Sequence, residues 1–529
     1  MARRQALNAT VFIVLVGLVS LPVAANNIED CHHLRNMELL QNDIFDPQDP
    51  EFMWIHKVAN ALHIVTKEVT VRDAVDGFEL CGSDRDLAEI ERYLRGRSYL
   101  KDAKVEEHTT AEGEPSIRIE TWDNWSLLPT VNFGRSGGET KFSVGLKDSN
   151  FLGYGIRTKL AYKSDYLRTG YELKVDSPLF LGNNSSAQLV LADNDDGSQT
   201  RIAFKKPYVS LNNTWAGEVY YDDALKTDIV RLGGEDINQF KSDTNDYGAW
   251  YSWSKGRQGN TSKRWSVGVT KIEANFSEFT TTTQPSDRYS LVPWIGFSWE
   301  TDGYRKLKDI YLINQVEDVN FGREFGISLG WDVSNQEQSQ GGIHWSAYWR
   351  KAYQLSQHSM VVSRAYAQGN ELSSGDQRAV VGMDNEIFMR LNRYFATYFR
   401  IDGVSSTNQY LDQPITLGGD NGVRGFPLQF QHGQHAISGS FETRYYPNYN
   451  IYQLFELGAV VFADIGKAFG GTVYENNSEE TLKSVGVGLR AYSSFASNAN
   501  IVHIDFSRPL IDDPRVNGWE WRVEVKQHF

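Results

Sequence analysis

The chain ends with Trp519-Glu520-Trp521-Arg522-Val523-Glu524-Val525-Lys526-Gln527-His528-Phe529, in which apolar and polar side chains alternate with a period of two. The tryptophans, the valines and the final phenylalanine share one face, and the charged side chains share the other. This pattern is typical of a β-strand between two different environments. In a soluble sheet the apolar face would cover a core, whereas in a membrane barrel it would contact lipid, with the charged face lining a wet lumen. The rest of the chain decides between the two.

The composition favours a large transmembrane β-barrel. Of 529 residues, 13% are aromatic and 45 are glycine, yet only 40% are apolar and the mean hydropathy is −0.45. A bundle of transmembrane helices is excluded, because each helix needs about 20 consecutive apolar residues. A barrel needs apolar side chains only at alternate positions. The net charge of −14 argues against a nucleic-acid partner, which requires a basic surface.

The N-terminus indicates export. Residues 1–25 are expected to be a signal peptide, since two arginines precede a short apolar run and residues 22–25 offer a small-residue cleavage site. The alternative, a membrane anchor, needs a longer apolar run. Residues 26–50 are expected to be a polar lead-in, either a short helix or irregular. Export would place Cys31 and Cys81 where disulfides persist, so a bridge between them and two separate thiols both remain open.

Residues 51–121 are expected to form a small α+β unit. The expected elements are a strand within residues 62–71, a helix capped by Ser83 and ending at Gly96, and strands at 103–107 and 117–121. The helix prediction depends on the stripe formed by Leu87, Ile90 and Leu94. The predicted order is therefore strand, helix, strand, strand.

Residues 122–529 show almost no helical pattern. Alternating segments recur between clusters of Asn, Asp, Gly and Ser, and roughly nineteen of them qualify as strands. No repeat of 20–50 residues is present, which makes a propeller less favoured. We therefore expect a mainly β chain whose residues 122–529 form an antiparallel barrel.

Two strand candidates near the C-terminus carry polar or small residues on the presumed inner face. Asp464 lies opposite the face of its aliphatic neighbours, and Gly486, Gly488 and Arg490 lie opposite Val485, Val487 and Leu489. Glycine removes side-chain bulk, so another segment can approach the wall closely. The candidate is the loop at residues 417–427, which has four glycines and lies in a segment of about 30 residues between strands.

These motifs resemble the superfamily of outer-membrane insertases and secretion transporters built from periplasmic POTRA domains and a barrel, which includes the bacterial surface antigen family. The resemblance rests on the loop Val423-Arg424-Gly425-Phe426, the strand motif Phe462, Asp464 and Gly466, the Gly-x-Gly-x-Arg strand of Gly486, Gly488 and Arg490, the acidic Glu442, and the early turn at Asn150-Phe151-Leu152-Gly153-Tyr154-Gly155. Five motifs in the family's order over about 340 residues are a specific signal.

The resemblance implies a barrel of about sixteen strands in the bacterial outer membrane, with one POTRA-like domain at residues 51–121 in the periplasm. Such a domain usually has two helices, and the second is expected within residues 73–82. The implied function is outer-membrane protein assembly or polypeptide translocation. The implied partners are outer-membrane lipid or lipopolysaccharide, a client polypeptide bound by the POTRA-like domain, and a periplasmic chaperone or lipoprotein. Two alternatives stay open: a two-partner secretion transporter for a dedicated client, and a surface antigen or channel without a protein client.

A physical argument for the loop accompanies the resemblance. The guanidinium of Arg424 offers a fork of donors that fits a carboxylate, and leaving it unpaired inside a lumen would be costly. We expect Asp464 to pair with it, with Glu442 as the second choice, so that the bond anchors the loop to the inner wall. The alternative is an exposed arginine and a separate, solvated aspartate, whose pairing would contribute little.

Other candidate chemistry is weak. Gly326-Ile327-Ser328-Leu329-Gly330 matches a hydrolase pattern, but that pattern needs a strand-turn-helix elbow and here lies within an alternating segment. His432 and His435 are close enough in sequence to share a metal, yet they have no acidic or thiol companion nearby. The sequence therefore predicts no enzymatic activity, no metal and no cofactor.

Overall fold

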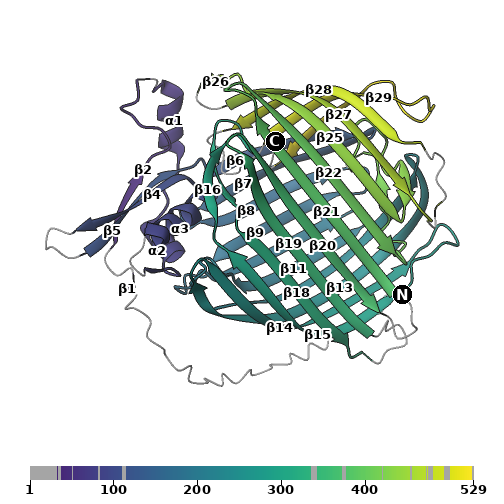
Figure 1. The fold of residues 1–529 in the computed structure, drawn as a ribbon, viewed down its shortest axis with the longest axis horizontal. Coiled ribbons are helices and arrows are strands. Elements are labelled where there is room, and N and C mark those ends of the chain that lie inside the picture. Colours follow the sequence, from purple (N-terminus) through teal and green to yellow (C-terminus); the bar gives the residue numbers. More distant parts are fainter. Residues whose placement is uncertain are drawn as a thin grey trace, which may run out of the picture.

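The computed structural model describes residues 32–33, 37–50, 52–80, 84–109, 115–334, 342–371, 377–419, 421–452, 455–471, 474, 480–493 and 501–526. The predicted signal peptide, Cys31, Cys81 and Phe529 lie outside these residues, so the structure does not bear on the predictions made for them. The described chain forms a small α+β unit beside one end of a large β-barrel (Figure 1).

The α+β unit packs helices on a three-stranded sheet. Its elements are β1 (His32–His33), β2 (Met37–Asn42), α1 (Trp54–Leu62), α2 (Glu68–Val75), β3 (Glu79–Leu80), α3 (Asp84–Arg95), β4 (Leu100–Thr109) and β5 (Pro115–Asp123). The sheet order is β2-β5-β4, with β2 parallel and β4 antiparallel to β5. Val71, Val75, Ile90, Leu94 and Ile119 are fully buried in one core, so α2 and α3 cover the same face of the sheet.

The sequence predictions for this unit are confirmed in part. The helix ending at Gly96 and the strands at 103–107 and 117–121 correspond to α3, β4 and β5. The strand predicted within residues 62–71 is wrong, because Val69 and Val71 belong to α2, where Val71 and Val75 are buried one helical turn apart. The first strand of the sheet is β2, so the expectation of a short helix or an irregular lead-in is wrong for residues 37–42, which pair with β5. The unit therefore begins before residue 51, and its second helix lies at 68–75 rather than within 73–82.

In the described residues, twenty long strands close an antiparallel barrel. They are β6 (Leu127–Ser136), β7 (Glu139–Phe151), β8 (Ile156–Ser164), β9 (Thr169–Pro178), β10 (Ser186–Asn194), β11 (Gly197–Lys206), β12 (Trp215–Leu232), β13 (Glu235–Gln258), β14 (Thr261–Ser277), β15 (Arg288–Thr301), β18 (Arg323–Asp332), β19 (Gly342–Ser356), β20 (Ser359–Glu371), β21 (Gln377–Arg390), β22 (Phe395–Thr407), β25 (His435–Tyr445), β27 (Phe455–Phe469), β28 (Leu482–Ser493), β29 (Ile501–Pro509) and β30 (Glu520–Lys526). The two-residue β26 (Asn450–Ile451) pairs with the start of β27.

The expectation of about sixteen strands is wrong, and the tally of roughly nineteen alternating segments is closer. Each strand has the same period-two pattern, so the pattern marks individual strands but not the number at which the sheet closes.

Two short hairpins lie outside the barrel wall. They are β16 (Tyr304–Lys308) with β17 (Val316–Asn320), and β23 (Ile415–Leu417) with β24 (Gln431–Gly433).

The barrel wall is apolar outside and polar inside. Leu329, Val461 and Leu489 are exposed on the outer face to more than half of their area, whereas the charged Arg490 is buried on the inner face. A barrel with this distribution spans a membrane. The prediction for the last strand is confirmed, because Trp521, Val523 and Val525 alternate in β30 with the inward and buried Glu520 and Arg522. In the described part of the chain, no helix combines the length and apolar character needed to cross a bilayer.

Across the residues that the structure describes, the junction between the first and last strands has the shortest ladder in the wall. Among the described residues, β30 pairs with β6 at one position, Val523 opposite Arg135, whereas β30 and β29 pair at seven positions and β6 and β7 at ten. Side chains supplement this junction. The rings of Phe133 and Trp521 stack at 5.7 Å on the outer face, and Arg135 Nε lies 3.1 Å from Glu520 Oε1.

The α+β unit is attached to the turns at one end of the barrel. The carbonyl oxygen of Gly153, in the β7–β8 turn that resembles the family's early hairpin, accepts hydrogen bonds from Lys67 N at 2.9 Å and Thr70 Oγ1 at 2.8 Å. Gly153 has a φ of 81°, a conformation that favours glycine. Asn184 and Asn213, in the next two turns at this end, donate to backbone carbonyls of the unit. The unit is therefore held by three successive turns.

Candidate functional site

The loop between β22 and β25 folds into the barrel. Its tip is closed by a hydrogen bond from Gly419 N to Phe426 O at 2.9 Å. Val423 and Phe426 are fully buried with Phe430, and they pack against Ala468 of β27 and Leu482 of β28. Apolar side chains thus seat the tip on the inner wall, on either side of Arg424.

Arg424 is 9% exposed and makes a fork of bonds to the wall. Its Nε donates to Asp464 Oδ2 at 2.7 Å, and its Nη2 donates to Asp464 Oδ1 at 2.8 Å. Its Nη1 donates to Glu442 Oε1 at 3.0 Å, and Nη2 also donates to Ser440 Oγ at 3.0 Å. The guanidinium lies over the ring of Phe462, 3.5 Å from its centroid. Both carboxylates that the sequence singled out therefore contact this arginine.

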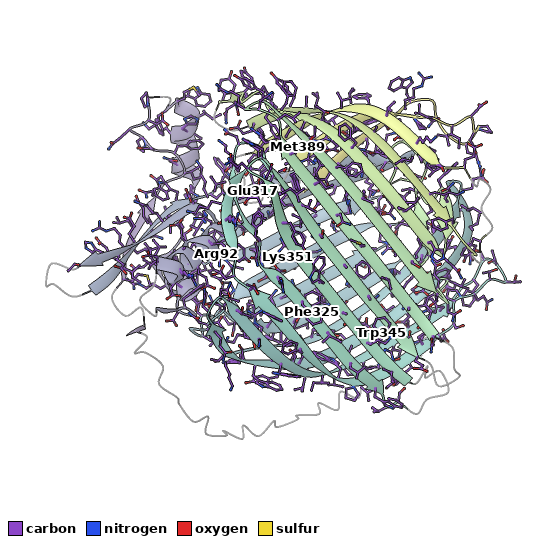
Figure 2. All side chains as sticks on the ribbon, in the orientation of Figure 1. Arg92, Glu317, Phe325, Trp345, Lys351 and Met389 are labelled. Atoms are coloured by element: carbon purple, nitrogen blue, oxygen red, sulfur yellow. The ribbon has the colours of Figure 1, made fainter. Side chains whose placement is uncertain are left out.

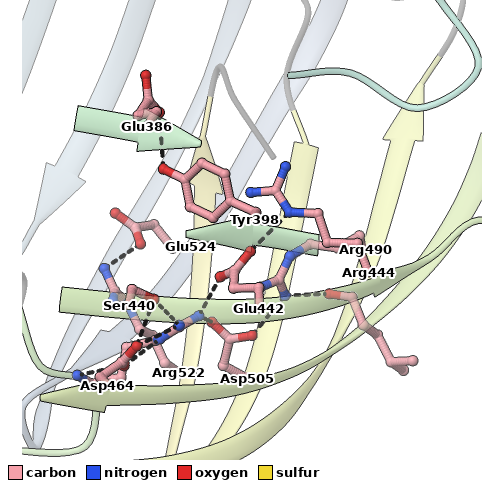
Figure 3. A network of polar contacts seen from close by, with 12 residues as sticks. Glu386, Tyr398, Ser440, Glu442, Arg444, Asp464, Arg490, Asp505, Arg522 and Glu524 are labelled. Atoms are coloured by element: carbon pink, nitrogen blue, oxygen red, sulfur yellow. Dashed lines mark hydrogen bonds and ion pairs between the residues drawn. The ribbon is translucent and has the colours of Figure 1, made fainter. Parts of the chain in front are cut away.

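Several buried ion pairs of the wall form one network (Figure 3). Next to the loop its cations are Arg424, Arg444 and Arg490, and its anions are Asp464, Glu442 and Asp505. Arg444 Nε donates to Glu442 Oε2 at 3.0 Å, and Arg490 Nη1 donates to Asp505 Oδ1 at 2.6 Å. Each of these six buried charges has an oppositely charged partner, and losing one partner of a buried pair is strongly destabilising.

The glycines of the motifs make room for this network. A Cβ atom on Gly466 would come within 2.9 Å of Val423 in the loop, and one on Gly486 would overlap the ring of Phe462. A Cβ on Gly488 would overlap the carboxylate of Asp505. Each glycine therefore leaves space for one neighbouring side chain, as expected where another group approaches a strand closely.

The electrostatic environment keeps Arg424 charged. The negative charges of Asp464, Glu442 and Asp505 lie around its guanidinium and compensate for its burial. The backbone N–H of Arg424 also donates to Asp464 Oδ2 at 3.2 Å, so one carboxylate holds both the side chain and the main chain of the loop. Such an arrangement can position a loop.

The structure brings the loop and strand motifs together and leaves the other candidates elsewhere. Val423, Arg424, Phe426, Glu442, Phe462, Asp464, Gly466, Gly486, Gly488 and Arg490 meet in the lumen, and Gly425, with a φ of 91°, turns the chain beside Ser507 and Pro509. Trp521, Val523 and Val525 lie on β30 and take no part in the anchor.

Sequence reasoning missed several members of the network. Ser440 and Arg444 flank Glu442 on β25 with a spacing of two, so the same period that marked the strand places all three on the inner face. Tyr398 and Glu386 extend the network to β22 and β21, where Tyr398 OH donates to Glu386 Oε1 at 2.9 Å. No short motif indicates these two residues, because their contact depends on strand pairing.

The weaker candidates have separate surroundings. Ser328 lies within β18 and shares a hydrogen bond with Ser346 on β19 at 2.7 Å. His432 contacts the carbonyl of Arg231, and His435 Nδ1 bonds to Ser405 Oγ at 2.8 Å. Among the described residues, no three His, Cys, Asp or Glu side chains are grouped so as to hold a metal ion.

No family model matches the chain, and no curated protein matches it. The solved structures to which it is similar include BamA from Haemophilus ducreyi lacking POTRA domains 1–3, with 11% identity, 93% of this chain and 84% of that chain covered, and a TM-score of 0.44. They also include CdiB from Escherichia coli, with 13% identity, 93% and 76% covered, and a TM-score of 0.48. CdiB from Acinetobacter baumannii has 11% identity, 94% and 74% covered, and a TM-score of 0.44. Such identities and TM-scores are too low to assign this chain to a family.

Proposed function

We propose that this chain is an outer-membrane protein of the POTRA-plus-barrel superfamily that assembles or inserts client polypeptides. The observation that carries the proposal is the meeting of the motif residues around Arg424. The loop tip, the Phe462 strand, the Gly486 strand and Glu442 come from separate segments, and together they form one buried anchor. If the four-residue loop motif were a chance match, there would be no reason for Asp464 and Glu442 to lie within hydrogen-bond distance of Arg424.

The junction of β6 and β30 supports insertion rather than passage through the lumen. Opening a sheet costs the hydrogen bonds of one ladder, and this ladder has one register pair among the described residues. An open junction exposes two strand edges, to which a client strand can pair. The anchored loop would meanwhile keep β25, β27 and β28 in register. Client folding and membrane insertion would supply the driving free energy, and we propose that no enzymatic step is involved.

In this proposal the α+β unit is a POTRA-like domain in the periplasm. In the described residues, β2 and β4 each pair with β5 alone, so each has one free edge that can accept an extended client segment. Outer-membrane lipid or lipopolysaccharide would contact the apolar outer face of the barrel, and a periplasmic chaperone or lipoprotein would deliver clients to the unit. An exporter for a dedicated client and a channel without a client remain the alternative functions.

Locking the β6–β30 junction tests the proposal. Cys31 and Cys81 are first replaced by serine, and Arg135→Cys and Val523→Cys are then introduced. Residues opposite each other in an antiparallel pair are close enough for a disulfide. The purified chain is placed in vesicles containing lipopolysaccharide and supplied with an unfolded outer-membrane barrel client. We expect the oxidised variant to lose client insertion and to recover it after reduction.

A matched control places the same crosslink elsewhere in the wall. Ile327→Cys and Ala347→Cys lie opposite each other in the long ladder between β18 and β19 and should leave insertion intact. Full insertion by the oxidised β6–β30 variant would contradict the proposal. Export of a secreted client through the locked barrel would instead favour the exporter.

A further inference from the structure

The connection between β15 and β18 is far longer than the barrel requires. Glu300 and Glu324 are paired in adjacent strands, so a two-residue turn is enough to join them. The chain instead uses residues 302–322, which form the β16–β17 hairpin at the end of the barrel that carries the α+β unit (Figure 1). The connection between β19 and β20 at the same end takes only residues 357–358.

The tip of this segment lies against strands far from those that it connects. Ile313 is 1% exposed and packs with Tyr492 of β28 and Ile501 of β29. In the strand order of the closed barrel, β29 is eight strands from β18, which is close to the opposite side of a twenty-strand ring. Asn314 Nδ2 donates to Glu456 Oε1 of β27 at 3.1 Å. The segment therefore reaches from the strands that it connects to the far wall.

The sides of the segment pack on the wall between these strands. Ile310 and Tyr311 contact an apolar cluster that includes Val362 of β20 and Phe388 of β21. Tyr311 OH donates to Glu386 Oε2 at 2.9 Å, and Arg444 Nη1 donates to Ile310 O at 3.3 Å. Arg444 also pairs with Glu442, which binds Arg424, so the segment and the lumen loop share one wall network.

Helix α3 holds the segment from outside the barrel. Arg95 Nη2 lies 2.7 Å from Asp318 Oδ2, and Lys306 Nζ lies 2.6 Å from Glu91 Oε1. Arg92 lies over the ring of Tyr304 at 3.7 Å. Figure 2 labels Arg92 on α3 and Glu317 on the β16–β17 hairpin, where the α+β unit meets the segment. A cavity of about 720 Å³ lies between α3, the hairpin and the barrel wall, which leaves the segment room to move.

We propose that residues 302–322 are a plug that closes the barrel lumen at the end of the α+β unit, and that α3 is the latch that keeps the plug in place. The wall contacts hold the segment inside the barrel end, whereas the α3 contacts are two ion pairs and a cation–π contact at the surface of the α+β unit. A polypeptide that binds the α+β unit and displaces α3 would release the plug. This inference goes beyond the proposed function, because it concerns the permeability of the barrel with no client present.

Ion conductance in planar bilayers tests the plug. In one variant, residues 302–322 are replaced by an Asn-Gly turn that joins β15 directly to β18. We expect its single-channel conductance to be severalfold higher than that of the unaltered chain. Heat-modifiable gel mobility verifies that the barrel has folded. An unchanged conductance in the folded variant would overturn the inference, whatever the outcome of the client-insertion experiment.

Charge reversal tests the latch in the full chain. Asp318→Arg places one cation opposite another, Arg95, and we expect the repulsion to increase the fraction of time spent in the high-conductance state. Combining it with Arg95→Asp restores an opposite pair and should return the conductance to its original value. The matched control is Lys57→Glu, at an exposed position of α1 outside both residues 302–322 and α3, and it should have no effect. A high conductance on plug removal without any response to Asp318→Arg would refute the latch.

Discussion

Replacing Arg424 with alanine should release the lumen loop while the barrel stays folded. The substitution removes the three side-chain partnerships with Asp464, Glu442 and Ser440. Glu442 keeps Arg444 as a partner. In the described part of the chain, Arg424 is the cation that lies within ion-pair distance of Asp464, so this buried carboxylate loses its counter-charge.

The free-energy cost of the substitution comes from the buried Asp464 carboxylate, which has lost its counter-charge. Removing one partner of a buried ion pair costs about 3–5 kcal/mol. The loop can avoid this cost by detaching, because water then hydrates Asp464. Since 1.4 kcal/mol corresponds to a factor of ten, the detached population should rise by about two to three and a half orders of magnitude. The barrel strands keep their ladders, so the stability of the wall should change little.

Thiol labelling measures the detached population. Val423 is completely buried, so Val423→Cys, in a chain without Cys31 and Cys81, reacts with a water-soluble maleimide only when the loop opens. We expect Arg424→Ala to accelerate labelling in proportion to the detached population. Arg424→Lys should give an intermediate rate, because it keeps the charge but loses the planar fork.

A double variant isolates the ion pair. Adding Asp464→Ala to Arg424→Ala removes the orphaned charge, so its labelling rate should be no higher than that of Arg424→Ala alone. A labelling rate in Arg424→Ala equal to that of the arginine-containing parent, together with full client insertion, would refute the reasoning.

Two further outcomes follow from the packing and the charges. Gly486→Ala should destabilise the barrel by about 1–3 kcal/mol in urea unfolding, because its Cβ would overlap Phe462, whereas Gly439→Ala, whose Cβ would contact Ile465 at 3.5 Å, should be close to neutral. Burial raises the pKa of Glu317 to about 7, despite its bonds from three backbone N–H groups. Because the pKa of Glu317 is higher in the folded than in the unfolded chain, protonated Glu317 stabilises the folded hairpin at acid pH. This stabilisation is lost as the pH rises through 7. The hairpin should therefore resist proteolysis better at pH 6 than at pH 8, and Glu317→Gln should remove this difference.

The sequence predicted the barrel because alternation is a local pattern, and it predicted the anchor chiefly through the resemblance of the loop and strand motifs to a known superfamily. Alternation identified strands that face lipid and a polar lumen, and the glycines on one face indicated a close approach to the wall. The chemistry of Arg424 required a buried carboxylate, and Asp464 was available on an inner face. The strand expected within residues 62–71 failed because β-branched residues also occur in helices when a core buries one side of them.

The residue types and their period determined that this chain forms a lipid-facing cylinder with charged side chains on its inner face. Tertiary structure alone decided the closure at twenty strands, the short junction between β6 and β30, and the placement of β2 in the small sheet. It also decided that residues 302–322 lie against strands far from those that they connect and contact α3. The physical reason is that alternation reports the environment of each residue, whereas ring size, junctions and lumen contacts depend on pairings between segments far apart in the chain.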